Sequence, residues 1–134
     1  MLLKIECKQQ LAELEGVLGK IYLGALKLFG KNFLTLLRKK SQKYLLNPED
    51  NLSGTIEELP SGFIIYLSGD RDILEREERL LKEFLDAEVK TQTKSNRLVQ
   101  QALNKLKAKA LGNSQNFLMN IGLFISYEWV EVSK

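Results

Sequence analysis

The chain has 134 residues, of which 44% are apolar and 28% are charged, and its formal net charge is +3. This length fits one domain spanning residues 1–134, and the apolar fraction is too high for a disordered chain. Histidine is absent and cysteine occurs once, at Cys7. These counts exclude imidazole catalysis, histidine-containing metal sites, an intrachain disulfide and cysteine-rich zinc sites. We therefore expect no metal, no other cofactor and no enzyme.

The beginning of the chain does not resemble a secretory signal, because Lys4 and Glu6 interrupt the first apolar residues. The most apolar stretch, residues 17–29, contains two lysines. It is shorter than the roughly 20 apolar residues that a membrane span requires. We expect a cytoplasmic protein without a transmembrane segment, and a single unpaired thiol fits a reducing compartment.

Charge is distributed in blocks along the chain. Residues 1–48 carry a net charge of +6, residues 49–88 carry −8, and residues 89–127 carry +6 without any acidic residue. Two interpretations remain open. The acidic and basic elements pack side by side and neutralise each other, or one basic block stays exposed and binds a polyanion.

The first third of the chain predicts one long helix over about residues 9–46, because apolar residues recur at steps of three and four. Two apolar stripes occupy so much of the circumference of this helix that other elements of its own domain, or another chain, must shield it from water. The first stripe contains Leu11, Leu14, Leu18, Ile21, Ala25 and Leu28, and the second contains Tyr22, Leu26, Phe29, Phe33 and Leu37.

A basic line follows the same predicted helix. Helical geometry places Lys27, Lys31 and Arg38 within about 20° of Lys20 around the helix axis. Gly30 offers a possible stop for the helix, but this unbroken phase favours continuity. The glycines of the segment lower its helix propensity, a cost that is easier to understand if they let another helix approach closely.

The rest of the chain predicts a β-hairpin over about 55–68, helices over about 71–89 and 96–111, and a strand over about 121–132. Asp70 is expected to cap the first of these helices. The resulting fold class is α+β, with a long N-terminal helix and two further helices packed with a small antiparallel sheet. That sheet is expected to contain the β-hairpin and the C-terminal strand.

Candidate chemistry is sparse. Glu57, Glu58, Asp70 and Asp72 are the acidic residues near a predicted strand end, but their spacing is not specific for a metal ion. Cys7 has no neighbouring base or second cysteine, so we expect an inert thiol.

The leading functional hypothesis is a small non-enzymatic interaction, assembly or adaptor module that acts through helix-mediated protein contacts. The over-wide apolar face makes a homo-oligomer the expected state. The residues assigned to the protein interface are Leu18, Tyr22, Leu26, Phe29, Phe33 and Leu37.

Two alternatives remain. One is a nucleic-acid-binding subunit that uses the acid-free stretch 90–109, whose cations would contact phosphates without reading sequence. The other is a small-molecule-binding regulatory domain with a pocket between the long helix and the sheet. The residues assigned to nucleic-acid binding are Lys90, Lys94, Arg97, Lys105, Lys107 and Lys109.

Overall fold

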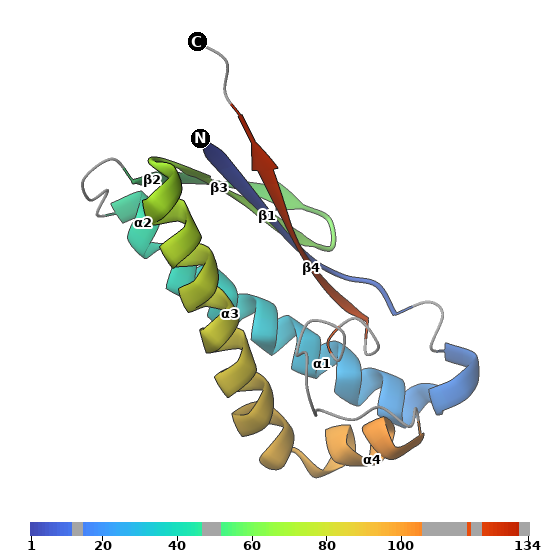
Figure 1. Ribbon diagram of the computed structural model, residues 1–134. Helices are drawn as coiled ribbons and strands as arrows, with labels where there is room; N and C mark the ends of the chain where they lie inside the picture. The colour runs from blue at the N-terminus through green and yellow to red at the C-terminus, as the bar shows by residue number, and fades with distance from the viewer. Residues whose placement is uncertain (12–14, 47–51, 106–117, 119–121, 132–134) are drawn as a thin grey trace.

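The fold is α+β, as predicted: an antiparallel four-stranded sheet is covered on one face by helices (Figure 1). The computed structural model describes residues 1–11, 15–46, 52–105, 118 and 122–131. In chain order the elements are β1 (Leu2–Gln9), α1 (Glu15–Ser41), α2 (Lys43–Leu46), β2 (Ser53–Leu59), β3 (Gly62–Ser68), α3 (Arg71–Lys94), α4 (Arg97–Lys105) and β4 (Leu123–Val130).

The order of strands in the sheet is β2-β3-β1-β4. The β2–β3 hairpin and the C-terminal strand are therefore present, as the sequence predicts, but β1 lies between them. The register aligns Ile5 of β1 with Ile65 of β3 and with Tyr127 of β4. Ile56 of β2 lies opposite the same Ile65, so one transverse row runs across all four strands.

The prediction of a helix beginning near residue 9 missed strand β1. Leu3, Ile5 and Cys7 are buried, whereas Lys4 and Glu6 between them are only half-buried. This alternation has the period of two that a strand with one buried face requires. The pattern covers only a few residues at the start of the chain, directly before a much longer apolar region. The sheet consequently has one strand more than predicted, and that strand is central.

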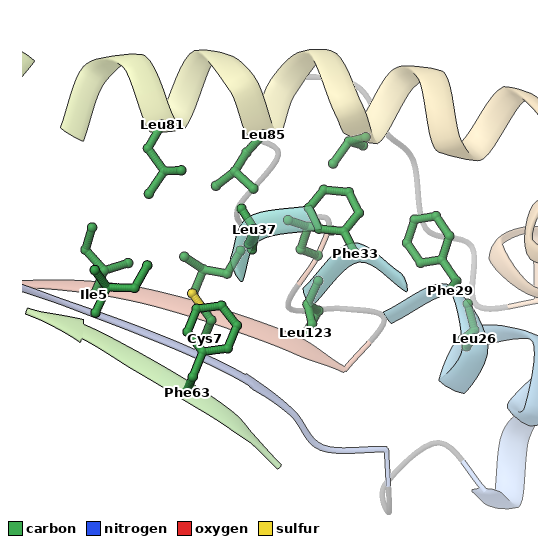
Figure 2. Packing of buried hydrophobic residues seen from close by; sticks show 14 of the residues in the cluster. Ile5, Cys7, Leu26, Phe29, Phe33, Leu37, Phe63, Leu81, Leu85 and Leu123 are labelled. Carbon is green, nitrogen blue, oxygen red and sulfur yellow. The ribbon is translucent and has the colours of Figure 1, made fainter. Parts of the chain in front are cut away.

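The core lies between the inner face of the sheet and the helices. Leu81 and Leu85 of α3 point toward the sheet, and Phe33 and Leu37 of α1 pack in the same cluster (Figure 2). Phe63 of β3 is fully buried in it. Burial of apolar surface on this scale is the main favourable contribution to folding.

After Gly19, only one of the two predicted apolar stripes of α1 faces the core. Leu26, Phe29, Phe33 and Leu37 are buried, in agreement with the second stripe. Of the first stripe, Leu18 is buried and Leu11 packs against the core, but Ile21 and Leu28 were assigned wrongly, because they are 73% and 60% exposed. Leu14 lies outside the described residues. Since a helix against a sheet buries one side, the other side of so apolar a helix is left in water.

Helix α1 is continuous through Gly30 but kinked at Gly19. Gly19 has φ 74° and ψ 172°, a conformation that glycine adopts without the steric cost of a side chain. Gly30 is buried against the side chain of Gln9 rather than against another helix. Gly30 therefore does not provide the close approach of another helix that was predicted for the glycines of this segment.

The later elements agree with the prediction except at two ends. Helix α3 continues to Lys94 and not only to residue 89, and Thr93 is buried there with its hydroxyl donating to the carbonyl of Val89 at 2.7 Å. Strand β4 runs from Leu123 to Val130. The predicted end of α4 near 111 lies outside the described residues.

We predict that Gly62→Ala destabilises the protein strongly. A Cβ at Gly62 would lie 1.9 Å from the carbonyl oxygen of Cys7 in the neighbouring strand, so the β1–β3 ladder would have to shift. We expect a loss of about 2–4 kcal/mol in the free energy of unfolding, measured by urea denaturation. Gly24→Ala is the matched control: no described atom lies within 4 Å of its new Cβ, and it should stabilise the protein by up to about 1 kcal/mol.

We also predict that Cys7 reacts with thiol reagents only when the protein unfolds. Desolvation by burial, with a smaller contribution from the charge of Glu6, raises the pKa of the Cys7 thiol to about 12. At pH 8 the rate of labelling by a maleimide should follow the rate of global unfolding. Because the folded protein keeps this proton while the unfolded chain loses it near pH 9, the contribution of Cys7 to stability should be present below pH 9 and fall as the pH rises toward 12. Rapid labelling of the native protein at pH 8 would contradict the assignment.

Candidate functional site

The structure places the six residues assigned to a protein interface in or beside the core of the chain itself. Leu18, Leu26, Phe29, Phe33 and Leu37 are buried there. Tyr22 is half-buried, and its hydroxyl lies 3.4 Å from the side-chain oxygen of Gln101 in α4. The helix therefore receives its cover from the sheet, α3 and α4. An interface formed by α1 would therefore have to use other side chains of this helix.

The described part of the predicted nucleic-acid-binding stretch is exposed. Lys90 and Lys94 lie in α3, and Arg97 and Lys105 lie in α4. Among the described residues, none of these four cations forms an ion pair, although Lys105 lies 4.8 Å from the centre of the Tyr22 ring. Lys107 and Lys109 lie outside the described residues. Nucleic-acid binding through this stretch stays a prediction.

Three of the four cations of the predicted basic line lie beside the turn that joins β2 to β3, whereas Lys20 does not line this region. Lys27, Lys31 and Arg38 line a groove with a volume of about 560 Å³ between this helix and the turn. The volume is within the usual range for small-molecule sites. The remaining lining residues are Gln9, Leu34, Thr35, Glu58, Leu59, Pro60, Ser61, Gly62 and Phe63.

Gln9, at the end of β1, ties the two walls of the groove together. Its backbone N–H donates to the carbonyl of Ser61 in the hairpin turn at 3.0 Å. Its side-chain amide donates to the carbonyls of Leu26 and Lys27 in α1, each at 3.3 Å. The amide reaches these carbonyls because Gly30 has no side chain: a Cβ there would lie 2.0 Å from the amide nitrogen.

The charges of the groove are unequal. Arg38 pairs with Glu58 at 2.5 Å, and its guanidinium carbon lies 5.0 Å from the centre of the Phe63 ring. Lys27 and Lys31 are exposed, and neither forms an ion pair with a described residue. Three cations and one carboxylate therefore line the groove, so its potential is positive and favours an anion.

The predicted acidic cluster is divided by the sheet. Glu58 faces α1 through its contact with Arg38, whereas Glu57, the preceding residue of β2, accepts a hydrogen bond from Tyr66 at 2.6 Å on the opposite face. Asp70 occupies the N-cap position of α3. In the part of the chain that the structure describes, no three acidic or cysteine side chains are grouped as metal ligands would be.

Sequence reasoning detected one wall of the groove and missed the other. The spacing of three cations in the sequence already places them on one side of the helix: Lys27, Lys31 and Arg38. A pocket between this helix and the sheet was also one of the predicted alternatives. The second wall, the turn at residues 60–62, reaches α1 through tertiary packing. The contact between Arg38 and Glu58 joins residues separated by 20 positions and has no local signal.

No protein-family model matches the chain, and comparisons with curated proteins and with solved structures return no match. Within the described residues, no helix combines the length and the apolar character that crossing a membrane would require.

Proposed function

We propose that the protein is a non-enzymatic binding domain whose groove between α1 and the β2–β3 turn takes a small anionic ligand. The observation that carries this proposal is the position of Lys27, Lys31 and Arg38, which line one groove opposite a single carboxylate. The volume of the groove, about 560 Å³, suits a small organic molecule. The chain has no histidine, so we assign the groove to binding rather than to imidazole-based catalysis.

An anion in the groove would relieve a repulsion within α1. Lys27 and Lys31 are four residues apart, so they are neighbours on the same side of the helix. Like charges at this spacing destabilise a helix by a few tenths of a kcal/mol. A bound phosphate or carboxylate would replace this repulsion with two attractions, which links binding to the stability of α1.

We predict that the double substitution Lys27→Gln, Lys31→Gln weakens the binding of pyrophosphate by about tenfold or more at low salt, as measured by isothermal titration calorimetry. Both side chains are exposed and unpaired among the described residues, so the fold should be unaffected. The matched control is Lys90→Gln, Lys94→Gln, which removes the same charge from the exposed end of α3. Equal losses in the two variants, or no binding by the native protein, would refute the proposal.

A second candidate function is assembly through α1, which the exposure of two large apolar side chains favours. Ile21 and Leu28 are seven residues apart, which places them on one side of the helix, and they are 73% and 60% exposed. Large exposed apolar side chains on one side of a helix are a feature of protein–protein contact surfaces. The partner in this proposal is a second copy of the chain or another protein.

A cytoplasmic location belongs to the same proposal and is supported by the single unpaired cysteine.

We predict that native protein self-associates as its concentration rises and that Ile21→Ser, Leu28→Ser is monomeric, in sedimentation-velocity experiments. Leu80→Ser, Leu98→Ser is the control, because these leucines are also exposed but lie on α3 and α4. A native protein that remains monomeric across the concentration range would remove the homo-oligomer from this proposal.

A further inference from the structure

The groove has an apolar side as well as a basic one. Leu34 and Leu59 are half-buried in its lining, Pro60 is exposed there, and Phe63 is fully buried behind it. The guanidinium of Arg38 lies over the ring of Phe63. This contact joins the basic side of the groove to its apolar side. The two kinds of surface therefore meet at one point, Arg38.

Building on the proposed anion site, we infer that the ligand is an amphipathic organic anion. Its phosphate or carboxylate binds Lys31 and Arg38, while Lys27, one helical turn before Lys31, adds positive potential. Its apolar body covers Leu34, Leu59 and Pro60. An inorganic anion would use the lysines and leave the apolar lining in water. An apolar body removes that lining from water, and the binding free energy gained grows with the area covered.

Glu58 has a defined role in this arrangement: it competes with the ligand for Arg38. The Arg38 and Glu58 side chains are 40% and 63% exposed, so their ion pair is accessible to solvent and contributes little to stability. Exchange of the carboxylate of Glu58 for the anion of the ligand therefore costs little. Removing Glu58 should leave Arg38 available and strengthen anion binding.

Strand β2 supplies a matched control for this role. Glu57 is adjacent to Glu58 and has the same charge, but its carboxylate accepts the hydroxyl proton of Tyr66 on the other face of the sheet. Glu57→Gln removes the same net charge as Glu58→Gln without affecting Arg38. A difference between the two variants therefore measures local competition and not the overall charge of the protein.

The test compares methyl phosphate, 1-naphthyl phosphate and 1-naphthol by isothermal titration calorimetry of the full chain. We expect 1-naphthyl phosphate to bind about tenfold more tightly than methyl phosphate, which has the same anionic group without the apolar body. Leu34→Ala should weaken the binding of 1-naphthyl phosphate more than it weakens the binding of methyl phosphate, and so reduce this advantage. Glu58→Gln should tighten the binding of both phosphates about two- to fivefold at low salt, whereas Glu57→Gln should change it less.

Equal affinities for methyl phosphate and 1-naphthyl phosphate would overturn the inference while leaving the anion site in place. If 1-naphthol, which has no phosphate, binds as tightly as 1-naphthyl phosphate, the inference is overturned as well, because the anionic group would then be dispensable. Unchanged or weaker binding to Glu58→Gln would overturn the competitor role of Glu58. If pyrophosphate and both organic phosphates fail to bind the native protein, the proposed function fails together with the inference.

Discussion

The structure depends on the burial of one face of the sheet by α1 and α3. Side chains of β1 and β3 such as Ile5, Cys7, Phe63 and Ile65 form this face, and α1 contributes Phe33 and its neighbours to the same cluster (Figure 2). Because these side chains are large and fully or nearly fully buried, the rotation of α1 about its own axis is fixed. Everything that α1 presents to solvent follows from that rotation.

The same rotation exposes two different surfaces of α1. Lys27, Lys31 and Arg38 are placed beside the β2–β3 turn, where they line the groove. Ile21 and Leu28 are left in solvent, although their spacing in the sequence is that of core residues. Ligand binding and assembly are therefore compatible proposals, since they use separate side chains of one helix, and substitutions at either set test one without altering the other.

The sequence predicted long periodic elements well and short or tertiary features poorly. The hairpin, α3, α4 and β4 were all predicted, because their patterns extend over several turns or strand residues. Strand β1 was missed, although Leu3, Ile5 and Cys7 alternate with charged residues, because this short pattern adjoins a stronger helical one. Of the groove, the cations of α1 were found on one line, but neither Glu58 nor Gln9 was connected with them.

The sequence by itself determined the α+β class, the phase of the basic line on α1 and the absence of histidine. These properties depend on residue type and on spacing along a single element, so they can be read locally. Tertiary structure decided which of two apolar stripes became core in the part of α1 after Gly19, because only one side of a helix can face a sheet. It also decided that Arg38 forms an ion pair with Glu58 and that the side chain of Gln9 packs against Gly30. Both contacts join separate elements that only packing brings together.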